Sequence, residues 1–175
     1  MSINNVILKP NYSSLLGKSE LPFEISKDGL EVLKYYTPTP RQTLSITSHN
    51  SKDSKIHIKA SDGYIYVTTK RLVYITASQG DINTFSVDVN LAPVLQFSHE
   101  IKLKWVGANY WEFIFFSPGS LEIASDGFPK DQYFKGQIQF NDGGIFTFLE
   151  HFNNVLNDAV NNSHIDEQLP QYSET

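Results

Sequence analysis

The sequence predicts a mainly β domain closed by a single C-terminal helix, and three observations support this prediction. Short stretches rich in β-branched and aromatic residues recur from residue 23 to residue 140, separated by turn residues. After Gly144 the apolar period changes from two residues to about 3.6 residues. A chain of 175 residues is long enough for one domain with its own core. We therefore expect two nearly orthogonal antiparallel sheets, forming a sandwich or partly open barrel that the helix caps.

The clearest predicted element is a β-hairpin at residues 63–77, around which we expect the sheet to form. Two apolar runs flank the polar residues 68–71, a pattern that predicts a hairpin with a four-residue connection. The first run alternates aliphatic and aromatic side chains. Ile65 and Val67 are therefore expected to face the core, while the neighbouring Tyr64 and Tyr66 face water.

The other predicted strands are short apolar runs bounded by Gly, Pro, Asn or Asp. They lie at about residues 23–25, 31–36, 43–47, 56–60, 85–89, 91–97, 101–105, 110–116, 121–124 and 133–140. Turns are the alternative for the first two runs, and a helix is the alternative for 110–116, which is almost continuously apolar. We expect the run at 56–60 to pair near the hairpin through a turn at Asp62-Gly63. Residues 1–22 have no clear apolar period and are predicted to form a separate segment over the surface of a domain that spans residues 23–160.

An amphipathic helix is predicted at about residues 143–160, with Asp142 as its N-cap. Apolar residues at helical spacing form one stripe, which consists of Ile145, Leu149, Phe152, Leu156 and Ala159. Residues 161–175 are rich in Asn, Ser, Gln and acidic side chains. Such a composition buries too little apolar surface to offset the entropy of ordering, so we expect a flexible acidic tail.

Charge and composition argue against several classes of function. Through Lys135 the chain has 14 basic and 13 acidic residues, whereas from Gly136 onward it has none and 6, which together give the net charge of −5. A nearly neutral body lacks the broad basic surface that nucleic-acid binding requires, so we expect no direct nucleic-acid partner. No run approaches the ~18 apolar residues of a membrane span, and no signal-peptide pattern is present. We expect a cytoplasmic protein, with the nucleus as the alternative location.

No motif predicts catalysis, a cofactor or a metal. The chain contains no Cys, and its five His residues lack the i, i+4 spacing of helical metal ligands. Residues 117–120 do not match a nucleophile elbow, and no glycine-rich phosphate loop occurs. We therefore expect that the protein is not an enzyme and that it has no catalytic, cofactor-binding or metal-binding residues.

Three separated motifs point to a known family. The hairpin has the pattern Gly63-x-Ile65-Tyr66-Val67-Thr68-x-x-Arg71-Leu72-Val73-Tyr74-Ile75, Val-Gly-Ala-Asn-Tyr occupies 106–110, and Asp-Gly-Gly-Ile occupies 142–145. These motifs resemble, in order, a GRAM-domain hairpin and the Phe-Gly-Ala-Asn-Tyr and Ala-Gly-Gly-Ala segments of the WW-domain-binding protein 2 family. The resemblance covers about residues 20–160. It implies a pleckstrin-homology-like (PH-like) GRAM fold and the role of a non-enzymatic adaptor.

The C-terminal residues offer a short recruitment motif. Leu169-Pro170-Gln171-Tyr172 is similar to the Leu-Pro-x-Tyr sequence that WW domains of HECT-type ubiquitin ligases bind. Pro170 favours an extended polyproline conformation, and the ring of Tyr172 suits an aromatic-lined groove. A chance match in a polar tail is the competing interpretation, since the family's long Pro- and Tyr-rich tails are missing here. The resemblance also implies a transcription-coactivator-like role as an alternative.

A second hypothesis is binding of a phosphoinositide at a membrane surface. PH-like domains often hold such headgroups with basic loop residues, and the candidates here are Lys52, Lys55, Lys70 and Arg71. Ordinary solvated surface is the competing interpretation for these cations, and a structural role is favoured for Arg71. Residues 105–116 concentrate aromatic side chains that mostly suit a core, and Trp111 is the candidate partner contact among them.

Overall fold

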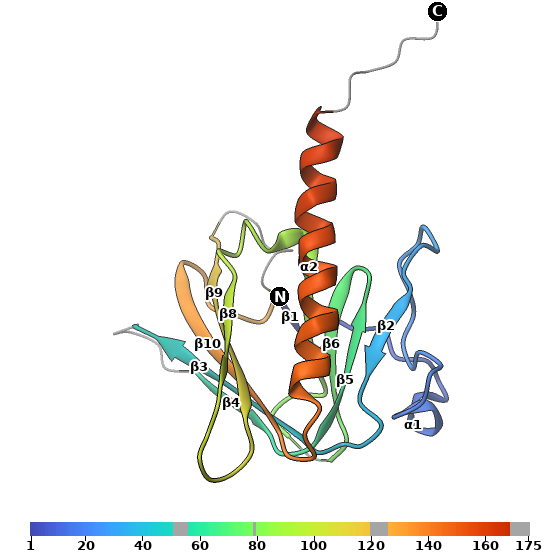
Figure 1. The fold of residues 1–175 in the computed structure, drawn as a ribbon, viewed down its shortest axis with the longest axis vertical. Helices are drawn as coiled ribbons and strands as arrows, with labels where there is room; N and C mark the ends of the chain where they lie inside the picture. The colour runs from blue at the N-terminus through green and yellow to red at the C-terminus, as the bar shows by residue number, and fades with distance from the viewer. Residues whose placement is uncertain (51–55, 79, 120–125, 169–175) are drawn as a thin grey trace, which may run out of the picture.

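The computed structural model describes residues 1–50, 56–78, 80–119 and 126–168, with residues 162–168 described for the backbone alone. It confirms the predicted fold class, because two five-stranded antiparallel sheets are closed by a C-terminal helix (Figure 1). The first sheet has the order β1-β7-β6-β5-β2 and consists of β1 (Ser2–Ile3), β2 (Leu33–Tyr36), β5 (Gly63–Thr68), β6 (Arg71–Thr76) and β7 (Thr84–Asp88). The second has the order β4-β3-β10-β9-β8 and consists of β3 (Gln42–His49), β4 (His57–Ala60), β8 (Ser98–Lys102), β9 (Tyr110–Ser117) and β10 (Gln132–Phe140).

The predicted hairpin is present as β5 and β6, but its connection is shorter than predicted. Val67 pairs with Leu72, and only Thr69 and Lys70 lie between the two strands. The Thr68 hydroxyl accepts hydrogen bonds from the backbone N–H groups of Lys70 (3.2 Å) and Arg71 (3.0 Å). β5 ends at Thr68 and β6 begins at Arg71, so both residues belong to the strands although their polar side chains are typical of a turn.

Several predicted strands differ in the structure. The run at 91–97 contains Pro93, which lacks a backbone donor, and the chain there forms a 3-10 helix (Val89–Leu91) followed by turns. The strand predicted at 101–105 ends at Lys102 as β8, and Phe23 makes only an isolated bridge to Leu8. β4 pairs with β3 in the second sheet, because the chain passes from the second sheet to the first between Ala60 and Gly63. The run at 121–124 lies outside the described residues.

The N-terminal segment, which in the structure comprises all residues before β2 (residues 1–32), covers the outer face of the first sheet, and its β1 extends that sheet beside β7. The short helix α1 (Tyr12–Leu15) belongs to this segment. Tyr66 is fully buried under the segment, so the prediction that it faces water was wrong. Its hydroxyl accepts a hydrogen bond from the backbone N–H of Gly17 at 3.0 Å, and burial raises its pKa to about 12. Gly17 has a φ of +73°, and a Cβ there would lie 2.6 Å from the carbonyl oxygen of Pro38, so the close approach requires glycine.

Helix α2 (Ile145–Gln168) closes the open side between the two sheets (Figure 1). Phe148 and Phe152 of α2 pack against Trp111 of β9, with ring centroids 5.1 Å from the indole in both cases. Trp111 also contacts Phe113, whose ring stacks at 5.8 Å on Phe85 of the first sheet. These rings join the helix and both sheets in one core.

The helix differs from its predicted limits at both ends. It continues to Gln168 rather than ending near Val160, because neither Pro nor Gly interrupts it before Pro170. Asp142 was predicted as the N-cap, but its carboxylate instead accepts hydrogen bonds from the Arg41 side chain at 2.7 Å and the Thr39 hydroxyl at 2.9 Å. Among the residues described, no helix is both long enough and apolar enough to cross a membrane.

One close contact in the core gives a test of this packing. Gly136 of β10 pairs opposite Phe113, and a Cβ at position 136 would lie only 2.0 Å from Cζ of the Phe113 ring. Gly136→Ala is therefore expected to lower the free energy of unfolding by about 1–3 kcal/mol, measured by urea denaturation. Phe113→Leu combined with Gly136→Ala should lose less than the sum of the two single variants. A Gly136→Ala protein as stable as the wild type would contradict the contact.

The core also predicts a pH dependence of stability. Nδ1 of His99 accepts a hydrogen bond from the indole N–H of Trp111 at 3.0 Å, which requires Nδ1 to be unprotonated. Burial lowers the pKa of His99 below its ordinary value of 6.5. The unfolded chain therefore binds a proton more readily than the folded chain, and stability falls as the pH drops below about 6.5.

His99→Gln isolates this effect, because its amide oxygen can still accept the indole proton but does not titrate. Urea denaturation at about pH 7.5 and about pH 5.5 should show a smaller loss of stability for the variant than for the wild type. Because the carboxylates and the other histidines are common to both proteins, equal losses would show that His99 does not contribute.

Candidate functional site

The structure describes three of the predicted contact residues. Lys52, Lys55, Leu169, Pro170 and Tyr172 lie outside the described residues. Lys70 and Arg71 are brought together at the β5–β6 connection, where they line a surface pocket of about 280 Å³. Trp111, in contrast, lies in the core.

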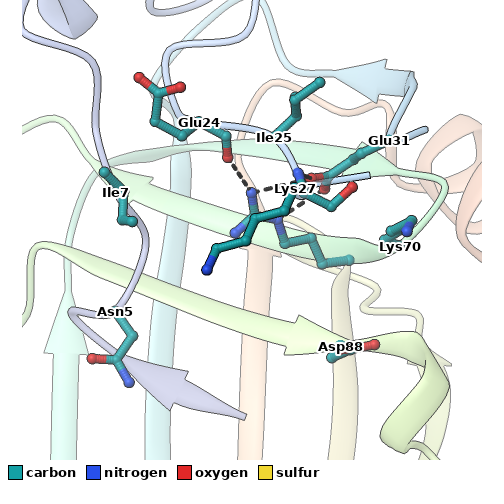
Figure 2. A pocket seen from close by; sticks show the side chains of 10 residues that line it. Asn5, Ile7, Glu24, Ile25, Lys27, Glu31, Lys70 and Asp88 are labelled. Carbon is teal, nitrogen blue, oxygen red and sulfur yellow. Dashed lines mark hydrogen bonds and ion pairs between the residues drawn. The ribbon is translucent and has the colours of Figure 1, made fainter. Parts of the chain in front are cut away.

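The pocket lies between the N-terminal segment and the ends of β6 and β7. Figure 2 shows Glu24 and Glu31 on the side of the segment, with Asp88 across from them on the strand side. The lining residues are Asn5, Ile7, Glu24, Ile25, Ser26, Lys27, Glu31, Lys70, Arg71 and Asp88. Segments far apart in the sequence therefore form this site.

Arg71 is held in place by a buried carboxylate. Glu31, whose side chain is 1% exposed, accepts hydrogen bonds from Nε of Arg71 at 2.8 Å and from its terminal nitrogen at 3.2 Å. The same carboxylate accepts from the Thr68 hydroxyl at 2.6 Å and the Ser26 backbone N–H at 3.0 Å. The guanidinium also lies 4.8 Å above the ring of Phe23. These contacts are those of a structural residue that ties the segment to the hairpin.

Lys70 is paired with a carboxylate of the same segment. Its ammonium group forms an ion pair and hydrogen bond with Asp28. This hydrogen bond, followed by those from the Ser26 hydroxyl and the Leu30 backbone N–H, holds the pKa of Asp28 well below its ordinary value. Asp28 is therefore ionised at neutral pH and compensates the charge of Lys70.

The charges around the pocket balance. Its lining contains three basic residues, Lys27, Lys70 and Arg71, and three acidic residues, Glu24, Glu31 and Asp88. A headgroup phosphate entering here would meet carboxylates as well as cations, and it would have to compete with the ion pairs already formed. The pocket therefore lacks the excess positive charge that an anion site needs. Within the described ranges, no group of three or more His, Asp or Glu side chains is arranged to hold a metal ion.

The candidate contact at Trp111 needs correction. Its side chain is fully buried between β9 and α2, so it is not available to a lipid or protein partner. Exposed apolar side chains lie instead in the loop between β8 and β9, at Leu103, Trp105 and Val106. This loop was missed in the sequence because the apolar pattern predicts a strand over 101–105. The lysines at 102 and 104 and Gly107 are, however, typical of an exposed turn.

The buried ion pair predicts a clear difference between the two hairpin cations. Arg71→Met keeps an apolar stem but leaves the Glu31 carboxylate buried without its partner, so we expect a loss of about 3–5 kcal/mol in the free energy of unfolding. Lys70→Met is the matched control, because it removes a more exposed pair and should cost far less than Arg71→Met. Urea denaturation measures both.

Adding Glu31→Gln to Arg71→Met should restore part of the lost stability, since it removes the unpaired charge. Equal losses for Arg71→Met and Lys70→Met would contradict the structural role of Arg71.

The comparisons with known proteins support the fold. No family model matches the chain, and no curated protein matches its sequence. A solved structure described as a Vps36 N-terminal PH domain matches with a TM-score of 0.53 and 15% sequence identity, covering 89% of this chain and 93% of that chain. At this identity the likeness shows the fold alone. The chain thus has a PH-like fold, while the comparisons give no support for the narrower WW-domain-binding protein 2 family.

Proposed function

We propose that this chain is a non-enzymatic GRAM-type adaptor that recruits a WW-domain protein through Leu169, Pro170 and Tyr172. A HECT-type E3 ubiquitin ligase is the proposed kind of partner, and the cytoplasm the proposed location. The observation that carries the proposal is the length of α2, which extends past both sheets (Figure 1).

Helix α2 has two parts, one that packs against the core and one that extends beyond it. Among the α2 residues whose side chains are described, Ala159 is the last that packs against the main core, and the helix continues to Gln168. At 1.5 Å per residue, this extension is roughly 13 Å long. Gln168, the residue that precedes the motif in the sequence, therefore lies at a distance from the body of the domain, which supports the proposal that a second domain can approach there.

The chemistry of the motif suits a WW groove. Residue 170 is proline, which has a fixed φ, lacks a backbone donor and favours the extended conformation that such grooves bind. Tyr172 supplies an aromatic ring with a polar tip for a pocket in the groove. The intervening Gln171 occupies the variable position of the motif and has no assigned contact.

The alternatives have less support from the described residues. Binding of a phosphoinositide through Lys70 and Arg71 is disfavoured by their ion pairs with Asp28 and Glu31. The same function through Lys52 and Lys55 stays a prediction, and so does the coactivator-like role. The adaptor is therefore the function that we advance.

The motif makes a sharp prediction for binding. In a calorimetric titration of the full chain with a WW domain of a HECT ligase, Tyr172→Ala should weaken binding by at least about tenfold, because it removes the anchoring ring. Gln171→Ala is the matched control and should bind like the wild type. Unchanged binding by Tyr172→Ala, or an equal loss in Gln171→Ala, would refute recruitment through this motif.

A further inference from the structure

We propose that the loop joining β8 to β9 inserts its tip, formed by Leu103, Trp105 and Val106, into the interface of a membrane that contains anionic lipid. This attachment surface is separate from the C-terminal motif and does not depend on it. It is also separate from the charge-balanced pocket at the hairpin.

The tip exposes an unusual amount of apolar surface. Trp105 is 104% exposed, Val106 89% and Leu103 64%, whereas the other tryptophan, Trp111, is fully buried. Exposing three neighbouring apolar side chains to water is energetically unfavourable, and patches of this kind typically mark an interaction site. A tryptophan is the most informative of them, because its ring is apolar while its N–H needs a polar partner.

The loop is convex and anchored at its base. It projects beyond the ends of β8 and β9 (Figure 1). The Asn109 side chain accepts a hydrogen bond from the Lys104 backbone N–H at 3.0 Å, and the Asn109 carbonyl accepts one from Phe140 at 3.1 Å. Gly107 turns the chain with a φ of +93°. A tip held in this way loses little further entropy on binding, and a convex tip suits a deformable interface that needs no matching cavity.

The charge of the loop favours an anionic surface. Residues 102–110 contain two lysines and no acidic residue, while the whole chain has a net charge of −5. Lys102 is compensated by Glu100 at 2.6 Å, so the cation that the loop offers is Lys104, whose ammonium lies 4.9 Å above the ring of Tyr110. A lysine beside a tryptophan is a combination found at membrane interfaces, where the cation contacts headgroups while the indole lies just below them.

A second copy of this chain is a poorer occupant of the tip. A stable dimer buries about 800 Å² on each partner, far more than three side chains of one loop provide. Two tips facing each other would also bring like-charged lysines together. A membrane has neither restriction, since it supplies both a deep apolar layer and negative charge.

The tip lies at the opposite end of the molecule from the end of α2. Figure 1 shows the β8–β9 loop near the start of α2, whereas Gln168 lies at the far end of the helix. Insertion of the tip therefore leaves the end of α2 directed away from the bilayer. Membrane attachment and recruitment of a partner are geometrically compatible.

Vesicle sedimentation of the full chain tests the proposal. The probes are phosphatidylcholine vesicles with and without phosphatidylserine. We expect the wild type to bind the anionic vesicles, and Trp105→Ser combined with Val106→Ser to lower the partition coefficient by at least about tenfold. Ile7→Ser combined with Leu30→Ser is the matched control, because these side chains are 69% and 70% exposed outside the loop, and it should bind like the wild type.

Fluorescence gives an independent readout from the same protein. Trp105 is the exposed tryptophan, so vesicles should shift the emission to the blue and protect it from iodide, and lipids brominated near the headgroup should quench it. Trp105→Phe should abolish these changes while Trp111 continues to report the folded core. The substituted side chains are exposed, and urea denaturation should show unchanged stability.

Four results would overturn the proposal: no vesicle binding, equal binding with and without phosphatidylserine, full binding by the tip variant, or equal loss in the control. Concentration-dependent sedimentation of the wild type that the tip substitutions abolish would instead identify a self-association site. Tyr172→Ala should bind vesicles like the wild type, which separates this test from that of WW recruitment.

Discussion

The packing of two α2 phenylalanines on the indole of Trp111 is the contact on which the arrangement of this domain depends. The two sheets do not close against each other on one side of the domain. Trp111 of β9 lies at this open side, where Phe148 and Phe152 of α2 cover it. Full burial of one such side chain contributes about 1.5–3 kcal/mol, so Phe148, Phe152 and Trp111 together are a large part of a marginal stability. Because the helix must cover this site, its direction is fixed, and with it the positions of both ends of the molecule (Figure 1).

Ion pairs perform a second structural task on the opposite face of the first sheet. The segment before β2 carries Asp28 and Glu31, and their partners are Lys70 in the β5–β6 connection and Arg71 at the start of β6. Arg71 therefore fastens a covering segment that otherwise contacts the sheet through apolar side chains such as Phe23. Cations used in this way are not available to a phosphate, which is why a basic sequence motif in a loop does not by itself define an anion site.

The sequence predicts strands and helices whose apolar pattern lies within the element itself. It does not predict burial that depends on contacts with segments far away in the chain. β9 and β10 are found within one residue, because their apolar runs are long and bounded by turn residues. The burial of Tyr66 depends on Gly17 and Phe23, about 40 or more residues away, and no period in the strand reveals it. Trp105 and Trp111 belong to one aromatic stretch, and only the end of β8 and the cover by α2 determine which of them is exposed. The tail composition concealed the helical extension, since polar residues weaken a helix prediction without stopping a helix.

The β8–β9 loop and helix α2 carry charges of opposite sign. The β8–β9 loop carries Lys104, whereas α2, which extends away from the loop, has four acidic residues and no Lys or Arg. An anionic surface attracts the first region and repels the second, and at physiological ionic strength this discrimination acts over about 8 Å. Since α2 is longer than that distance, a bilayer in contact with the loop would interact with one end of the molecule only. The same helix that completes the core therefore acts as a spacer between the loop that we propose to contact lipid and Gln168, the residue that precedes the proposed recruitment motif.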